Sequence, residues 1–201
     1  MNLAASTGPL ASGFQRPAWD SQAVFRSVLE AMSYPGRIAP LSVTLEVPAP
    51  LELATAAVCL ALLDYETAIW VQPGPGAPAI HTYLRFHCGC PAVESPEKAD
   101  FALVLQPQEA PALETFAQGS AEQPHRSATV ILQIANLEGG APMTLRGPGI
   151  ADTQVIRPAG LASHFWQQWR RNSAQYPLGV DVILTSGARL AALPRTVQVE
   201  A

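Results

Sequence analysis

The feature of this sequence that most constrains its fold is a series of short, continuous apolar segments spaced along the chain. They are TAIWV (67–71), FALVLQ (101–106), SATVILQI (127–134) and GVDVILT (179–185). Runs of this length are typical of strands buried on both faces of a sheet, and helical segments lie between them. This alternation predicts a single α/β domain in which helices flank a mixed β-sheet.

The intervening segments have the patterns of helices. Apolar residues recur at a helical period in 20–33 and in 160–172. Residues 51–63 are apolar almost all round, which predicts a buried helix. A further short helix is predicted over 109–118, whereas 80–89 (IHTYLRFHCG) fits either a short helix or a strand.

Turn-forming residues divide the remaining chain. QPGPGAP (72–78) contains three prolines and two glycines and is predicted to be a loop. The sequence NLEGG, between the apolar segments 127–134 and 141–147, predicts a β-hairpin. Residues 1–18 are predicted to form an irregular N-terminal arm, and 19–201 a single α/β domain without internal repeats.

Composition excludes several classes of protein. The net charge is −4 and no basic run is present, so a nucleic-acid partner is not expected. The longest apolar run, 53–63, is too short to span a bilayer, and the N-terminus lacks a secretory signal. We therefore expect no membrane partner and a cytoplasmic location. Three cysteines cannot form an even disulfide framework, which fits a reducing compartment.

A histidine and two cysteines lie close together in FHCGCP (86–91). His87, Cys88 and Cys90 have no second pair of ligands elsewhere in the sequence, whereas structural zinc needs four ligands. Adjacent His87 and Cys88 side chains would diverge, and a redox pair usually has two residues between its thiols. We therefore expect no metal and no cofactor here, and interpret the thiols as small buried hydrophobes.

Two further groups of residues leave alternatives open. LRGPGI (145–150) places Arg146 beside two glycines. This loop either holds an anion or, as we favour, forms a rigid corner between strands. Asp64 and Glu66 lie between a predicted helix and a predicted strand, where a carboxylate pair can do acid/base work. More often such residues cap a helix end and face solvent.

No grouping of side chains is recognisable as a catalytic site, but the chain is rich in arginine. Eleven of its twelve basic residues are arginines, whose planar guanidinium groups suit phosphate oxygens. The candidate anion-binding or proton-transferring residues are Arg85, His87, Arg146, Arg195, Asp64 and Glu66.

Several stretches, taken together and in order, resemble one family, the H subunit of the bacterial carbon–phosphorus lyase core complex. The resemblance covers roughly residues 19–200. Cys88 stands where threonine is more often expected, which again argues against a thiol or metal role. The stretches are FRSVLEAMSYPGRI (25–38), LALLDYETAIW (60–70), LRFHCGCP (84–91), ADFALVL (99–105), LRGPGI (145–150), YPLGVDVILT (176–185) and LAALPRT (190–196).

The resemblance implies a role in the use of alkyl phosphonates as a phosphorus source. In that complex of G, H, I and J subunits, a phosphonate is joined to the anomeric carbon of the ATP ribose and adenine is displaced. The product is a ribose 1-phosphonate 5-triphosphate. This step is attributed to the I subunit, and the later carbon–phosphorus cleavage to a radical iron–sulfur centre on the J subunit. The H subunit has no assigned catalytic residue and forms a homodimer when isolated.

The resemblance also implies a fold like the large domain of pyridoxal-phosphate-dependent transferases. Such an enzyme needs a lysine for its Schiff base, and the only lysine, Lys98, lies in a polar turn where we expect it to be solvated. We therefore expect the fold without the cofactor. The favoured hypothesis is an accessory, non-catalytic subunit. The alternative is a ligand-binding or catalytic subunit that contacts nucleotide or phosphonate oxygens directly.

Overall fold

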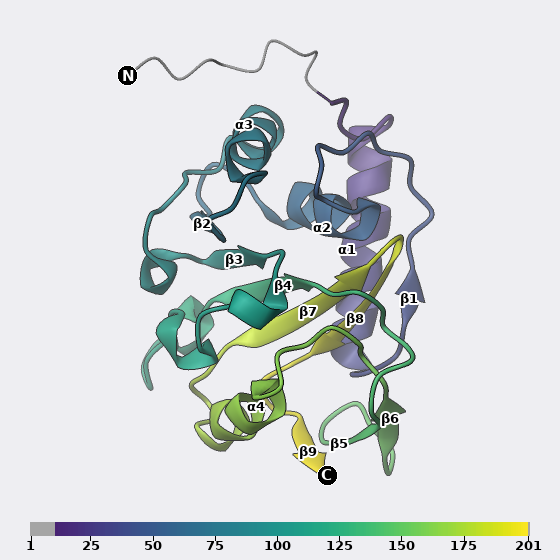
Figure 1. Cartoon of the computed structure of the whole chain (residues 1–201), viewed down its shortest axis with the longest axis vertical. Helices are drawn as coiled ribbons and strands as arrows, with labels where there is room; N and C mark the ends of the chain where they lie inside the picture. The colour runs from purple at the N-terminus through teal and green to yellow at the C-terminus, as the bar shows by residue number, and fades with distance from the viewer. Residues whose placement is uncertain (1–10, 201) are drawn as a thin grey trace.

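A computed structural model describes residues 11–200 and contains one large and one small β-sheet in this range (Figure 1). The large sheet has the strand order β1-β8-β7-β4-β3-β2. Strands β2, β3, β4 and β7 are parallel, and β8 and β1 continue the sheet in antiparallel fashion. The predicted mixed sheet flanked by helices is therefore confirmed. Its strands are β1 (Ala39–Pro40), β2 (Ile69–Val71), β3 (Phe101–Val104), β4 (Thr129–Gln133), β7 (Asp181–Ser186) and β8 (Arg189–Leu193).

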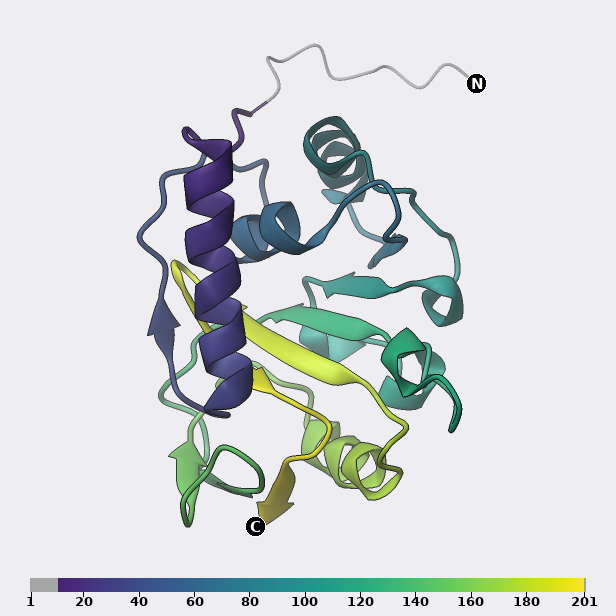
Figure 2. The same ribbon diagram turned by 180° about the vertical axis from the view of Figure 1, so that it is seen from behind.

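Helices cover both faces of this sheet. Helices α1, α2 and α3 pack on one face, and α4 packs on the other together with the small sheet (Figure 1, Figure 2). The helices are α1 (Pro17–Ser33), α2 (Leu53–Leu62), α3 (Ala77–Cys88) and α4 (Phe165–Ala174), with short 3-10 turns η1 (Pro96–Lys98), η2 (Pro107–Glu109), η3 (Leu113–Thr115) and η4 (Pro124–Arg126). No helix among residues 11–200 is long and apolar enough to cross a membrane.

The central strands are apolar on both sides because both faces of the sheet are covered. In β4, Val130 and Leu132 pack in the cluster that includes Trp169 of α4, whereas Ile131 packs in the cluster under α1, α2 and α3. Side chains alternate between the two faces along a strand, so a continuous apolar run fills two cores. This explains why the four apolar segments form neighbouring parallel strands.

The small sheet is antiparallel and has the order β6-β5-β9, with β5 (Met143–Arg146), β6 (Gln154–Ile156) and β9 (Gln198–Glu200). It is joined to α4 by a buried hydrogen bond, in which Trp169 Nε1 donates to the carbonyl of Val197 at 3.0 Å. Leu145 and Val199 of this sheet extend the core beneath α4.

Two predictions of local structure were wrong. Segments 127–134 and 141–147 do not pair as a hairpin: β4 lies between β3 and β7, and β5 belongs to the small sheet. The doubly buried pattern of β4 overrides the turn signal after it. Residues 109–118 do not form a helix either, because Pro111 has no N–H to donate and leaves only the turns η2 and η3.

The remaining segments agree with the predicted types of structure, with shifted boundaries. The ambiguous segment 80–89 lies in helix α3, which ends where Gly89 adopts a left-handed conformation with φ of 70°. Helix α1 begins at Pro17, and the Asp20 carboxylate accepts a hydrogen bond from the Arg16 backbone N–H at 2.9 Å. The first ten residues of the predicted N-terminal arm lie outside the described residues.

Candidate functional site

A cleft of about 460 Å³ opens between the large sheet and the small sheet. Its apolar lining includes Leu184 of β7, Ala191 of β8 and Ile156 of β6, all of them buried. The volume is within the range of small-molecule sites, which combine apolar walls with a few polar groups. The cleft is therefore the first candidate for ligand binding in this chain.

Arginines line the polar part of this cleft. Arg37 and Arg157 are exposed, and neither forms a salt bridge among residues 11–200. The Arg37 guanidinium carbon lies 4.3 Å from the centroid of the Tyr34 ring, a cation–π contact that leaves its N–H groups available. Glu138 also lines the cleft, but its charge is paired with Arg189 at 2.7 Å. The two unpaired cations favour an anionic ligand.

A tight turn after α1 places Arg37 at the cleft. Gly36 has φ of 80°, and a Cβ there would lie 2.7 Å from Ile156 Cγ2 and from Leu145 Cδ1. The Gly36 N–H also donates to the carbonyl of Ala192 on β8 at 3.1 Å. Glycine is required because a left-handed backbone and two close neighbours leave no room for a side chain.

The loop 147–149 packs against this same turn. A Cβ on Gly149 would collide with the backbone carbonyl of Ser33, and Gly149 has φ of 82°. The preceding Arg146 is bound by two carboxylates, Asp152 at 3.2 Å and Glu200 at 3.0 Å. Hydrogen bonding to Glu200 raises the pKa of Arg146. The loop is thus a corner between the small sheet and α1, and Arg146 already has anionic partners.

Arg195 is also fully engaged within the protein. Its Nη2 lies 2.6 Å from Asp181 Oδ2, its Nε donates to Asp181 Oδ1 at 3.1 Å, and its Nη1 donates to the carbonyl of Pro124 at 3.1 Å. Only 13% of the Arg195 side chain is exposed. A bidentate, largely buried pair of this kind ties the chain after β8 to the start of β7.

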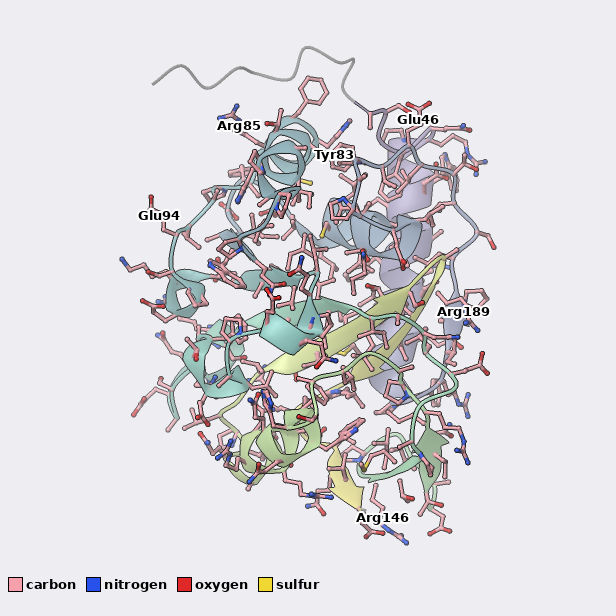
Figure 3. All side chains as sticks on the ribbon, in the orientation of Figure 1. Glu46, Tyr83, Arg85, Glu94, Arg146 and Arg189 are labelled. Carbon is pink, nitrogen blue, oxygen red and sulfur yellow. The ribbon has the colours of Figure 1, made fainter. Side chains whose placement is uncertain are left out.

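Arg85 and His87 lie on α3, at the opposite end of the molecule from Arg146 (Figure 3). Arg85 is exposed and lines a separate cleft of about 370 Å³ with His81 and Cys90. The Nε2 atom of His87 lies 3.0 Å from the carbonyl of Ala11 and its ring contacts Tyr83. His87 therefore attaches the segment before α1 to α3.

Asp64 and Glu66 form a solvent-facing turn between α2 and β2. Asp64 Oδ1 accepts a hydrogen bond from the Glu66 N–H at 2.9 Å, and the Asp64 N–H donates to Thr67 Oγ1 at 2.8 Å. Both acidic residues are exposed. Their turn lies beside the end of α3, since a Cβ on Gly89 would lie 3.7 Å from Tyr65 Cβ. Arg146 and Arg195 are paired elsewhere, so the six candidate residues do not assemble into one site.

The cysteines lie between α2, α3 and the start of the segment that follows α3. Burial raises the pKa of Cys59, and hydrogen bonding between Cys88 and Cys90 raises the pKa of Cys88 and lowers that of Cys90. Among the described residues, no group of three or more histidine, cysteine, aspartate or glutamate side chains is arranged to hold a metal ion.

The carboxyl ends of the parallel strands, where open α/β sheets commonly bind ligands, are occupied by the chain's own hydrogen bonds. Gln72 Oε1, after β2, accepts hydrogen bonds from the N–H groups of Leu105 and Gln106 at 3.0 and 2.8 Å. Gln133 Oε1, at the end of β4, accepts from the Glu52 N–H at 2.9 Å and from Thr55 Oγ1 at 2.7 Å. These amides connect neighbouring segments, so their polar atoms are already hydrogen-bonded beside the cleft of about 230 Å³ that Gln72 and Gln106 line.

Fold and site together define an α/β protein with an arginine-lined cleft beside its sheet and with strand-end amides that are hydrogen-bonded within the chain. The family model described as "Bacterial phosphonate metabolism protein (PhnH)" matches residues 12–200, and the chain belongs to this family.

Two relatives agree with this family. The chain is 36% identical to the alpha-D-ribose 1-methylphosphonate 5-triphosphate synthase subunit PhnH of Rhizobium meliloti (strain 1021) over 93% of this chain and 94% of that protein. It is 34% identical to the putative C-P lyase subunit protein HtxG of Stutzerimonas stutzeri over 89% of this chain and 85% of that protein. The family resemblance drawn from the sequence is therefore confirmed.

Sequence reasoning missed the two arginines of the cleft. Arg37 stands in the turn YPGR, whose Pro-Gly pair was a usable signal, because a fixed turn after a helix holds the next side chain in place. Arg157 follows the short strand β6 and had no comparable signal. Its position beside Arg37 depends on how the small sheet packs on the large one.

Proposed function

We propose that this chain is an accessory, non-catalytic subunit of a carbon–phosphorus lyase core complex. In this role it is needed to form ribose 1-phosphonate 5-triphosphate from ATP and an alkyl phosphonate. The observation that carries the proposal is the match over nearly the whole chain to the relative named as a subunit of ribose 1-methylphosphonate 5-triphosphate synthase. The second relative, named as a putative C-P lyase subunit, supports the same assignment.

The contacts that the candidate polar side chains make within the chain support an accessory role. Arg146 and Arg195 are held by carboxylates of the protein itself. Asp64 and His87 take part in local hydrogen bonds. Acid/base catalysis requires a group that is free to exchange a proton with the reacting molecule, and these groups already have partners within the chain.

The partners we propose are the G, I and J subunits of the complex, with a homodimer for the isolated chain. We place the protein in the cytoplasm, where ATP is available, and propose that 19–201 act as one domain.

We also propose that the large sheet is related to the large domain of pyridoxal-phosphate-dependent transferases, without their cofactor. The only lysine, Lys98, is exposed in the turn η1. A Schiff-base lysine needs a pocket that lowers its pKa and holds the cofactor, so the residues present do not fit pyridoxal phosphate. An absorbance spectrum with added pyridoxal phosphate tests this, since an internal aldimine would contradict it.

The direct test uses the bacterium that encodes this chain. Deletion of its gene is expected to abolish growth on methylphosphonate as the sole phosphorus source, and the affinity-tagged chain is expected to co-purify with the G, I and J subunits. The isolated chain is expected to release no adenine from ATP and methylphosphonate. Normal growth of the deletion strain would overturn the proposed role, and adenine release by the isolated chain would overturn its non-catalytic character.

The cleft favours a second candidate function, a subunit that binds nucleotide or phosphonate oxygens directly. Arg37 and Arg157 have no carboxylate partners among the described residues, and guanidinium groups bind such oxygens in bidentate fashion. The apolar walls suit a sugar or base rather than a bare anion.

Calorimetric titration with ATP tests this second function. The double variant Arg37→Gln/Arg157→Gln is expected to lose ATP binding at least tenfold. Arg126→Gln, an exposed arginine on η4 outside the cleft, is expected to bind as the wild type does. Equal affinity of all three proteins would rule out the cleft as the nucleotide site.

A further inference from the structure

The two cysteines at the end of α3 are nucleophilic side chains that the proposed function does not use. Cys88 is the last residue of α3, Gly89 ends the helix, and Cys90 begins the segment that leads to the edge of the large sheet. The single intervening residue was the reason to interpret these thiols as small hydrophobes, since redox pairs usually have two. A disulfide requires that the two cysteines lie close together, which does not depend on a fixed spacing.

The glycine between the cysteines brings their backbones close together. Gly89 is in the left-handed conformation, with φ of 70° and ψ of 3°. In a helix, residues two apart have Cα atoms about 5.4 Å apart, and a single left-handed residue gives a similar separation. Disulfides join Cα atoms about 4.4–6.8 Å apart. A disulfide can therefore form between Cys88 and Cys90 without a large movement of the backbone.

Backbone hydrogen bonds fix this turn on both sides. The Gly89 N–H donates to the carbonyl of Arg85 at 3.1 Å and so closes the last turn of α3. Beyond the second cysteine, the carbonyl of Pro91 accepts a hydrogen bond from the Ile69 N–H of β2 at 2.9 Å. Because the turn is held between the helix and the sheet edge, each thiol has the other at a high effective concentration. This favours a disulfide within the chain.

The two thiols differ in how readily they ionise. Cys88 lies in the last turn of α3, where the carbonyl dipoles disfavour a thiolate. Its Sγ lies 3.9 Å from the carbonyl oxygen of Cys59, an acceptor for the S–H. Hydrogen bonding between Cys88 and Cys90 lowers the pKa of Cys90 and raises that of Cys88. Cys90 is therefore the sulfur that forms the attacking thiolate, and Cys88 is the one that remains protonated.

Cys90 lines a cleft through which another molecule can reach it. The side chain is only 4% exposed, so a reactant has to enter this cleft of about 370 Å³. Arg85 lines the same cleft, extends outward from α3 (Figure 3) and forms no salt bridge among residues 11–200. Its charge attracts an anionic reactant, and glutathione is one. The Asp64 carboxylate opposes ionisation of Cys90, but it is a smaller influence than Cys88.

The third cysteine differs from this pair. Cys59 is fully buried in α2, and burial raises its pKa. A buried, protonated thiol is inert, since reactivity requires both access and a thiolate. The interpretation as a small buried hydrophobe therefore fits Cys59, whereas Cys88 and Cys90 have the proximity and the access that a redox pair needs.

We infer that Cys88 and Cys90 form a dithiol site that reacts with low-molecular-weight disulfides such as oxidised glutathione and closes to a disulfide within the chain. In the first step the Cys90 thiolate attacks one sulfur of oxidised glutathione, and one glutathione leaves as a thiolate. In the second step Cys88 loses its proton and attacks the sulfur of Cys90, and the second glutathione leaves. The two protein thiols give up two electrons and two protons, and one oxidised glutathione becomes two reduced ones.

Oxidation of the isolated full chain tests this site. The chain is incubated with mixtures of oxidised and reduced glutathione, and the remaining thiols are blocked with N-ethylmaleimide in denaturant. The tryptic peptide 86–98 contains both Cys88 and Cys90, whereas Cys59 lies in another peptide. After oxidation, mass spectrometry is expected to show peptide 86–98 lighter by two hydrogens and without N-ethylmaleimide. Cys59 is expected to be blocked.

Substitutions test the separate roles of the residues. Cys88→Ser keeps the attacking thiol and is expected to stop at a mixed disulfide between Cys90 and glutathione. Cys90→Ser is expected to react with oxidised glutathione at least tenfold more slowly, because the remaining Cys88 thiol is protonated. Arg85→Gln is expected to slow the first step about threefold. The matched control is Arg26→Gln, an exposed arginine on α1, which is expected to react as the wild type does.

Three results would overturn the inference. They are a peptide 86–98 that keeps both thiols at a large excess of oxidised glutathione, a disulfide that includes Cys59, and a Cys90→Ser protein that reacts as fast as Cys88→Ser. Circular dichroism checks that the serine variants are folded, and the wild-type result does not depend on them. No partner subunit takes part in these steps, so each of these results would leave the proposed accessory role unaffected.

Discussion

The carboxyl ends of the parallel strands and the cleft beside the small sheet are contrasting surfaces of the same large sheet. At the strand ends, polar side chains such as Gln72 and Gln133 are saturated by the backbone of the chain. In the cleft, Arg37 and Arg157 are exposed and have no carboxylate partner among the described residues. The first surface holds the fold together, and the second is free to bind something else.

This contrast shows that the protein does not use its sheet in the way that ligand-binding α/β folds commonly do. An α/β sheet with open strand ends offers polar groups to a ligand, and this one uses those groups for its own hydrogen bonds. The unpaired charges lie instead at the edge where the antiparallel strand β8 and the small sheet meet the turn after α1. Substitutions at the two surfaces should therefore have opposite consequences for stability and for binding.

The largest effect on stability is expected at the carboxyl ends of the parallel strands. Gln72→Leu removes the acceptor of two backbone N–H groups and the donor to the Gln106 carbonyl, and Gln72 itself is buried. We expect the free energy of unfolding to fall by about 3 kcal/mol, measured by urea denaturation. Gln72→Glu keeps the acceptor and should lose less. Equal losses in the two variants would contradict the assigned role of the acceptor.

A somewhat smaller loss is expected where the cleft is built. Gly36→Ala introduces a Cβ against Ile156 and Leu145 at a residue with positive φ. We expect about 2 kcal/mol of destabilisation, together with weaker ATP binding because Arg37 is displaced. Gly139→Ala also has positive φ but meets no atom within 4 Å, so it serves as the control for backbone strain alone. A Gly36→Ala protein no less stable than this control would contradict the packing argument.

The free energy of unfolding should fall at alkaline pH because Cys59 of α2 is buried. The Cys59 thiol is fully buried, and burial raises its pKa above that of an unfolded cysteine. Below about pH 8.5 the thiol is protonated in both states and has no effect. Above that pH the unfolded chain releases a proton that the folded chain retains, so the free energy of unfolding falls by about 1.4 kcal/mol per pH unit.

Denaturation of Cys59→Ala at pH 7 and pH 10 checks this titration. Its stability should depend less on pH over this interval than that of the wild type. For each protein, the free energy of unfolding at pH 10 should be compared with the value of the same protein at pH 7, because Cys59→Ala also removes packing contacts. An identical slope in the two proteins would show that other groups cause the alkaline loss; Tyr83, whose pKa burial raises to about 12, would be the next to examine.

The smallest effect on stability is expected for the arginines of the cleft. Arg37→Gln and Arg157→Gln should each change the free energy of unfolding by less than about 0.5 kcal/mol, because both side chains are exposed. Any loss of growth on methylphosphonate in these variants would then report on binding and not on folding. A large loss of stability would place them with the structural arginines, such as Arg195.

Much of the fold was predictable from the sequence because the signal was strong. Segment 101–106 contains β3 and segment 179–185 contains all of β7 except Ser186, since a run that is apolar at nearly every position is best covered from two sides. The strands with which β4 pairs were not predictable from the turn residues that follow it. NLEGG favours a hairpin locally, but β4 gains more by lying between two parallel strands than by pairing with the short β5.

The candidate site was much less predictable. Arg146 and Arg195 have the side chains that bind anions, and the sequence contains no sign that Glu200 and Asp181 would meet them. These pairs join residues that are 54 and 14 positions apart. Charge pairing across such separations is set by packing. Local sequence patterns therefore identify arginines that can bind anions, but they do not show that the charge of these arginines is already paired with a carboxylate of the chain.

The sequence by itself determined the type of fold, the family and the list of groups able to bind phosphorus oxygens. Each of these depends on residue identity or on neighbours along the chain, which a linear pattern records. Only the tertiary structure decided which of those groups are neutralised and which remain free, and that the turn holding Arg37 lies beside Arg157. Such proximity follows from how the two sheets pack, because packing brings together residues that local propensity does not relate.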